Sequence, residues 1–266
     1  MRILGAVFVD HVAVQHLTDF IWIGGNPYDD AKLEFVTRIL VSLRTGITEL
    51  EEYYQGLATG NHHSRPNSQR FFPYIREYPS ESGTVTFSYL AFLTIPPKAI
   101  FHAVTSDPHG GEQIIVKFVQ RYSVKAHRIL EAAGFAPKLL YCSMEDPNSP
   151  DLAGLNMVVM EYINGGTTYE LYGYNSLPAP IFGQIEAALQ GLHDENIVFG
   201  DLRLPNLMVR NERVLFIDFD WCGEHDMDKY PISLNEDPDI KWHPDVRPGA
   251  TMRTNHDIHM LNHMRP

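Results

Sequence analysis

Three side chains that carry oxygen atoms, Asp201, Asn206 and Asp218, lie close together in one polar and strand-forming part of the sequence. Residues 207–209 and 214–217 are apolar runs separated by a polar turn, so we predict that they pair as a hairpin. Antiparallel pairing places the beginning of one strand beside the end of the other. The three side chains are therefore expected to converge on one small volume.

Such a group of oxygen atoms suits a hard divalent cation. Magnesium is usually held by one or two protein groups together with water and substrate phosphates. We predict Asn206 and Asp218 as magnesium ligands, and Asp201 as the group that orients or deprotonates an incoming hydroxyl. The alternative is that each residue serves an ordinary turn, which is the favoured interpretation for any one of them alone. Their combination between two strands favours the site.

A predicted antiparallel sheet precedes this segment. Residues 84–93, 100–105 and 114–119 are rich in β-branched and aromatic residues and are separated by turn-forming sequences. The third of these strands contains Lys117. A lysine in such a strand either lies at a solvated edge or faces a ligand, and from the strand alone both interpretations remain open.

Other elements are predicted from hydrophobic periodicity and from capping residues. Ser123 is a plausible N-cap, and Gly134 a plausible stop, for a helix over residues 123–133. Further along the chain we predict strands at 137–142 and 156–163, and helices at 181–194 and 256–264.

The first part of the chain shows no residues arranged for chemistry. Two β-like runs over residues 2–23 precede two helical patterns, at 33–43 and 47–57. A polar linker follows, in which His62 and His63 are adjacent but lack other metal ligands nearby. We predict either an appendage that packs on the rest of the protein or the remnant of a larger domain.

Composition excludes several classes of protein. The chain has 266 residues, of which 44% are hydrophobic, so we expect a globular fold. With 33 acidic and 21 basic residues its net charge is −12, which argues against nucleic-acid or membrane partners. Cys142 and Cys222 are the two cysteines, and we expect free thiols. Since no apolar run reaches the roughly 18 residues of a membrane span, we expect a soluble cytoplasmic protein.

The loop from Asp201 to Asn206, with the sequence DLRLPN, is followed by an apolar strand that ends in Asp218-Phe219. This pattern resembles the catalytic loop and metal-binding segment of the protein-kinase-like superfamily. The resemblance is to its compact, divergent members of the fungal-type or aminoglycoside-phosphotransferase-like branch. It implies an α+β, two-lobed fold with an antiparallel sheet in the N-lobe, a truncated, mainly helical C-lobe and an N-terminal β/α appendage. The implied boundaries are 1–77 for the appendage, 78–163 for the N-lobe and 164–266 for the C-lobe.

The resemblance also implies cofactors and roles. ATP and magnesium would be the cofactors, and a hydroxyl-bearing protein or small molecule the phosphate acceptor. Lys117 would hold the phosphates of the nucleotide, and backbone groups around Glu161 and Ile163 would meet the adenine. Asp201 would accept the proton of the acceptor hydroxyl, and Arg203 would steady the γ-phosphate. Asn206 and Asp218 would hold the metal. Asp257 would bind the backbone of the catalytic loop, an interpretation we favour over a metal site formed by His256, His259 and His263.

The chain also departs from the family pattern. Phe199-Gly200 replaces the usual His-Arg before the catalytic Asp, and Asp220 replaces the Gly of the Asp-Phe-Gly motif. No Gly-rich loop is found, and alignment places Ala126 where the family has the glutamate that pairs with the strand lysine. Two hypotheses follow. The first is an ATP- and magnesium-dependent phosphotransferase. The alternative is a weak or inactive pseudokinase that acts as a nucleotide-binding or protein-interaction module.

Overall fold

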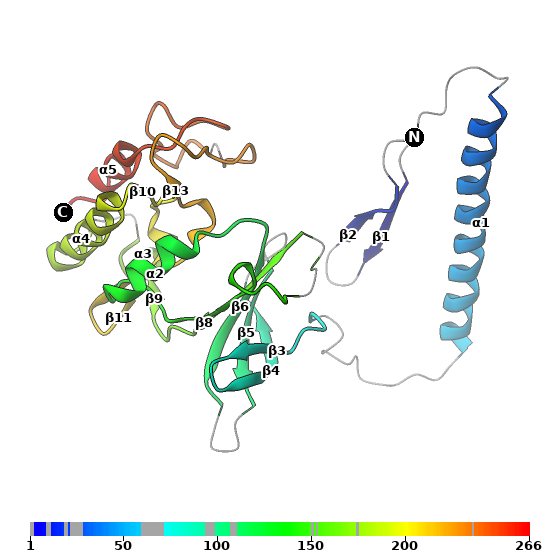
Figure 1. Cartoon of the computed structure of the whole chain (residues 1–266), viewed down its shortest axis with the longest axis horizontal. Helices are drawn as coiled ribbons and strands as arrows, with labels where there is room; N and C mark the ends of the chain where they lie inside the picture. The colour runs from blue at the N-terminus through cyan, green and yellow to red at the C-terminus, as the bar shows by residue number, and fades with distance from the viewer. Residues whose placement is uncertain are drawn as a thin grey trace. The chain divides into compact units, whose positions relative to one another are not determined.

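The computed structural model describes residues 3–8, 12–18, 21, 29–59, 72–93, 99–106, 111–149, 152, 154–173, 176–235 and 237–266. The chain divides into two compact units, Met1–Asn67 and Ser68–Pro266 (Figure 1). The expected pair His62 and His63 lies outside the described residues.

The first unit contains a hairpin and one long helix. Strand β1 (Leu4–Phe8) pairs with β2 (Val12–His16) in antiparallel fashion. Helix α1 spans Asp30–Thr59 without a break, so the prediction of two separate helices was wrong. Gly46 lies between the two predicted segments but does not adopt a positive φ. A glycine in a helix costs about 1 kcal/mol relative to alanine and does not by itself end the helix.

A six-stranded antiparallel sheet begins the second unit. Its strand order is β3-β4-β5-β6-β8-β7 (Figure 1). The strands are β3 (Glu77–Ser80), β4 (Gly83–Phe92), β5 (Ala99–Thr105), β6 (Gln113–Val119), β7 (Leu139–Cys142) and β8 (Asn156–Glu161). The predicted strands of this region are thereby confirmed. One face of the sheet is covered by a buried cluster that includes Phe87, Tyr89 and Phe101.

Helices and short strands form the rest of this unit. The helices are α2 (Val124–Ala132), α3 (Thr168–Tyr172), α4 (Ala179–Asp194) and α5 (Thr254–Asn262), and α4 contacts α5 (Figure 1). The strands are β9 (Gly166–Thr167), β10 (Ile197–Val198), β11 (Leu207–Arg210), β12 (Arg213–Phe216) and β13 (Gly223–Glu224). Three-residue 3₁₀ turns occur at Ser143–Glu145, Leu204–Asn206 and Phe219–Trp221.

The predicted hairpin and the predicted helix cap are both present. β11 pairs with β12 in antiparallel register, with Leu207 opposite Phe216. The Ser123 side chain accepts a hydrogen bond of 3.3 Å from the amide of Ala126, which caps α2. Gly134 follows the end of that helix with φ +76°.

One large core holds the hairpin, α2 and α4 together. The buried face of α4 consists of Ile181, Phe182, Ile185, Ala188, Leu189 and Leu192, and it packs into the same cluster as the buried residues of β11, β12 and α2. The hairpin is therefore fixed on a rigid support. Within the described ranges, none of the helices is long and apolar enough to pass through a lipid bilayer.

Candidate active site

The loop 199–206 and the hairpin bring Asp201 and Asn206 together. The Asn206 carbonyl accepts a 2.9 Å hydrogen bond from the amide of Ile217, which ties the start of β11 to the residue after β12. The side-chain amide of Asn206 donates from Nδ2 to the carbonyl and to Oδ2 of Asp201, both at 2.9 Å. Both residues are buried. The two bonds use both Nδ2 hydrogens, so Asn206 Oδ1 is the atom left to face a ligand.

Asp218 adopts an unusual backbone conformation. Its φ and ψ are both 67°, in the left-handed region, just before the 3₁₀ turn Phe219–Trp221. Non-glycine residues seldom occupy this region, and those that do often lie at functional sites. The Asp218 carboxylate lines one pocket together with Asn206 and a second pocket together with Asp201. Asp218 therefore borders one pocket with each of the other two predicted oxygen donors, while Asn206 Nδ2 bonds Asp201 Oδ2.

Lys117 of β6 joins this group from the sheet. The residue is 3% exposed, and Nζ lies 2.5 Å from Asp218 Oδ1 and 2.6 Å from Asp220 Oδ1. The residue is therefore not a solvated edge lysine but a buried cation held by two carboxylates. Burial opposes its charge, but Asp218 and Asp220 outweigh burial and raise the pKa of Lys117.

In the sequence, Asp220 stood out only because it replaces the glycine of the Asp-Phe-Gly motif of kinases. In the structure it is the second partner of Lys117. The position where a kinase-like chain has its helix glutamate is the buried Ala126, and Glu131 of the same helix pairs with Arg128 at 3.2 Å. No carboxylate of α2, which lies wholly in the described part of the chain, pairs with Lys117. The only sequence signal for Asp220 was its charge beside Asp218.

Two carboxyl groups of the site have raised pKa values. Burial, followed by the repulsion of Asp218, raises the pKa of Asp220 to about 7, although Lys117 opposes this. Burial also raises the pKa of Asp201, and its bonds to Arg203 oppose the rise. Burial is the largest cause of both rises, and among the described residues the three carboxyl groups of Asp201, Asp218 and Asp220 meet only two cations, Lys117 and Arg203. The pocket is thus suited to an additional cation.

Arg203 holds Asp201 in a two-point contact. Its Nε and a terminal nitrogen lie 2.5 Å and 2.6 Å from the two carboxylate oxygens. The guanidinium carbon also lies 6.0 Å from the centre of the Trp242 ring. Sequence reasoning predicted Arg203 as a phosphate ligand and did not foresee that it binds the predicted base. The contact uses two of its five N–H donors and leaves three.

A cavity of about 420 Å³ lies between the sheet and the hairpin. This is within the usual range for small-molecule pockets, and most of its lining is apolar. It is lined by Leu93, Ile100, Ile115, Lys117, Pro137, Met160, Glu161, Tyr162, Ile163, Gly165, Thr167, Glu170, Pro205, Asn206, Met208, Ile217 and Asp218. A smaller pocket of about 340 Å³ is lined by Asp201, Arg203, Asp218, Asp220, Trp221 and Asn235. Asp218 is the residue common to both.

The predicted hinge residues line the larger cavity but are partly engaged within the protein. The amide of Glu161 donates to the Lys138 carbonyl at 2.9 Å, and the Glu161 carboxylate forms an ion pair with Arg210. Ile163 is buried, 4% exposed. The backbone at Ile163 therefore remains the better candidate for contact with a flat ring, and the Glu161 amide is already occupied.

Asp257 of α5 supports the loop 199–206, as predicted. Its carboxylate accepts hydrogen bonds from the amides of Phe199 at 2.7 Å and Gly200 at 2.9 Å, and it lies 3.0 Å from His193 Nε2. Gly200 has φ +81°, and a Cβ there would lie 2.4 Å from the end of the Met252 side chain. The positive φ, together with the Trp221 carbonyl oxygen 2.8 Å from the Cβ position, is the physical reason for a glycine before Asp201.

His127 of α2 fixes the side chain of Phe219, the residue between Asp218 and Asp220. Its imidazole stacks on Phe219 with ring centres 4.5 Å apart and planes 8° apart. His127 Nε2 donates to the Pro137 carbonyl at 2.8 Å, and Nδ1 accepts from the Tyr122 hydroxyl at 2.6 Å. Burial lowers the pKa of His127 to about 4. A neutral, fully bonded ring thus positions the segment that carries both carboxylates.

Comparison with known proteins agrees with this architecture. No protein-family model matches the chain. Among solved structures, the chain is similar to the Cydia pomonella granulovirus kinase PK-1, with a TM-score of 0.51 and 17% sequence identity. The match covers 66% of this chain and 67% of the viral kinase. At this identity the likeness shows the fold alone, and the fold is kinase-like.

Proposed function

We propose that the protein is an ATP- and magnesium-dependent phosphotransferase that transfers the γ-phosphate to a hydroxyl of a protein or a small molecule. The observation that carries the proposal is the meeting of Lys117, Asn206 and Asp218 at one cavity, with Asp201 beside it. The kinase-like fold supports it. We also propose the two-lobed division at residue 163, because the large sheet precedes that point and α3, α4 and α5 follow it. The proposed appendage corresponds to the first compact unit, Met1–Asn67, since β3 of the sheet already begins at Glu77.

Asn206 and Asp218 would hold the magnesium ion. Their side chains supply oxygen atoms, which magnesium prefers, and Asp218 also lies near the carboxyl group of Asp220, whose pKa is raised by burial and by Asp218. When bound, the ion would neutralise charge on the phosphates of the nucleotide. We assign Asp220 as the group that holds Lys117 when Asp218 turns to the metal, in place of the absent helix glutamate.

Asp201 is the proposed acceptor of the hydroxyl proton. It lies in the smaller pocket with Asp218, where an acceptor molecule has access. Asn206 and Arg203 fix its carboxylate from two directions. Arg203 is proposed to keep Asp201 oriented and to offer its remaining N–H groups to the transferred phosphate.

A second candidate function is a pseudokinase that binds nucleotide without transferring phosphate. The specific observation in its favour is that both catalytic charges are already paired. Lys117 is held by Asp218 and Asp220, and Asp201 is held by Arg203. In this state two of the three N–H donors of Lys117 are already used by carboxylates, so one is left for a phosphate.

Substitution of Asp201 tests the proposal. Asp201→Asn keeps the side-chain shape and removes the proton acceptor, so turnover should fall by at least about a hundredfold while nucleotide affinity changes little. Asp239→Asn is the matched control, because Asp239 is exposed and lines neither pocket. Unchanged turnover in Asp201→Asn would remove the role assigned to this residue.

Thermal unfolding with and without ATP and magnesium separates the two candidate functions. A ligand that binds only the folded state raises the melting temperature. A rise accompanied by turnover in the wild-type protein supports the phosphotransferase. A rise without turnover on any tested acceptor, and without ATP hydrolysis, supports the pseudokinase, and no rise contradicts both.

A further inference from the structure

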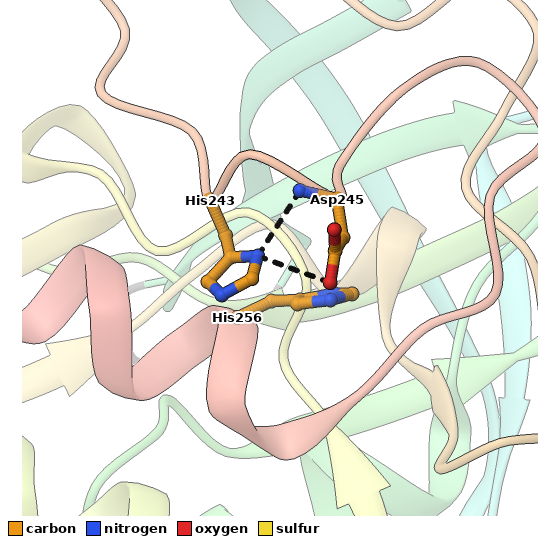
Figure 2. A group of neighbouring side chains, drawn as sticks. All are labelled: His243, Asp245 and His256. Carbon is orange, nitrogen blue, oxygen red and sulfur yellow. Dashed lines mark hydrogen bonds and ion pairs between the residues drawn. The ribbon is translucent and has the colours of Figure 1, made fainter.

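A second cluster of potential metal ligands lies outside the pockets described above. His243 and Asp245 belong to the irregular segment between β13 and α5, and His256 belongs to the first turn of α5 (Figure 2). One possible ligand atom of each residue lies within 4.8 Å of those of the other two. His243 Nδ1 lies 3.8 Å from Asp245 Oδ2 and accepts the Asp245 amide at 3.1 Å.

His256 has a buried nitrogen with no partner. The residue is 2% exposed, and its Nε2 has no hydrogen-bond partner among the described residues. Its other nitrogen, Nδ1, lies 3.1 Å from the Tyr230 hydroxyl and 3.3 Å from the Arg253 amide. A buried polar atom without a partner costs about 1–3 kcal/mol. Figure 2 shows this ring directly beside the Asp245 carboxylate.

We propose that His243, Asp245 and His256 bind a divalent transition-metal ion, and zinc is the ion that suits them best. Two imidazoles and one carboxylate are common zinc ligands, and water can complete a tetrahedral site. Magnesium and calcium prefer sites made of oxygen atoms alone. The site is therefore chemically distinct from the proposed magnesium site at Asn206 and Asp218.

The local structure is compatible with this coordination. Tetrahedral zinc places neighbouring ligand atoms about 3.3 Å apart, so the cluster has to contract by about 1.5 Å at most. The Asp245 side chain is 63% exposed and is free of packing that would prevent such a movement. His256 would bind through Nε2 and donate from Nδ1 to the Tyr230 hydroxyl, as metal-binding histidines commonly do. The 3.3 Å contact with the Arg253 amide is then given up.

Both metal-binding segments adjoin residues that support the catalytic loop. His256 precedes Asp257, which binds the amides of Phe199 and Gly200. His243 follows Trp242, whose ring faces Arg203. An ion that joins these segments would fasten α5 to the chain that packs on the loop. We therefore assign the site a structural role.

Zinc binding by the full-length, metal-stripped protein tests the proposal. Affinity is measured by competition with a chromophoric chelator, for wild type and for His243→Ala, Asp245→Asn and the double variant. These positions are chosen because His256 is buried and its loss could unfold the protein. We expect the wild type to bind zinc, and each single variant to bind at least about tenfold more weakly. His263→Ala, an exposed histidine of the same C-terminal region, is the control and should bind as the wild type does.

A thermal measurement gives a second readout. Zinc should raise the melting temperature of the wild type and of His263→Ala, but not of the double variant. The proposal is overturned if the double variant binds zinc as tightly as the wild type. It is equally overturned if the wild type does not bind zinc.

Discussion

Mild acid should lower the free energy of unfolding of the protein through protonation of His127. The ring is buried in its neutral form against Phe219, and burial lowers its pKa to about 4. In the unfolded chain a histidine titrates near its ordinary pKa of about 6.5. Between these values the unfolded state binds a proton and the folded state does not. The stability contributed by the neutral ring is therefore fully present above about pH 6.5 and is lost as the pH falls towards 4.

The size of the effect follows from the two pKa values. A difference of about 2.5 units corresponds to about 3 kcal/mol when the titration is complete. At about pH 5 the linkage relation gives a loss of about 2 kcal/mol relative to about pH 7.5. This is a large part of the roughly 5–15 kcal/mol that typically stabilises a domain.

Urea unfolding at several pH values measures the loss. Tryptophan fluorescence suits the purpose because Trp221 and Trp242 stack in the second unit, with ring centres 6.1 Å apart. His127→Gln removes the titrating group and retains a donor and an acceptor for Tyr122 and Pro137. The variant should lose about 2 kcal/mol less than the wild type over the same pH interval. His263→Gln, at an exposed position, should follow the wild type.

Equal losses in the wild type and His127→Gln would refute this reasoning. The neutral state of His127 would then contribute nothing to the pH dependence, and the acid sensitivity would have to come from other groups. A larger loss in the variant would be just as damaging, because it would mean that His127 stabilises the folded state when charged.

Two further predictions concern the supports of the site. Asp257→Ala leaves the buried amides of Phe199 and Gly200 without an acceptor, so the free energy of unfolding should fall by about 3 kcal/mol or more. Urea unfolding measures this loss, and a loss below about 1 kcal/mol would contradict the supporting role of Asp257. Asp220→Asn removes one charged partner of Lys117, so the affinity for ATP with magnesium should fall by about tenfold. Calorimetry measures the affinity, and an unchanged value would argue that Asp218 alone positions the lysine.

Much of the fold follows from local patterns that can be read directly. The alternating strands β4 to β6, the cap at Ser123 and the apolar stripe of α4 depend on neighbouring residues, and the structure contains each of them. The bonds from Asp257 to the loop 199–206 were predicted from the resemblance alone. Asp257 is 58 residues from Phe199 and 57 residues from Gly200 in the sequence, which is too far for any local pattern to indicate contact.

The ion pairs of the site could not be predicted from the sequence. Lys117 and Asp220 are 103 residues apart in the sequence, and only the tertiary fold brings the side chain from β6 to the turn Phe219–Trp221. The contact between Arg203 and Asp201 depends on the rotamers of two side chains two residues apart, which no periodicity encodes. The unbroken helix α1 was missed for a different reason, because its residues were read as two separate helical patterns, at 33–43 and 47–57, whereas the helix continues through Gly46.

The closeness of Met252 and the Trp221 carbonyl to Gly200 limits how the protein can be controlled. In many kinases a phosphorylated activation segment becomes ordered by pairing with arginine side chains, one of which precedes the catalytic aspartate. At position 200 no side chain fits, so a phosphate arriving from a modified segment would find no cation there. Introducing an arginine at position 200 would strain the loop 199–206, because Gly200 has φ +81° and a Cβ there would lie 2.8 Å from the Trp221 carbonyl oxygen.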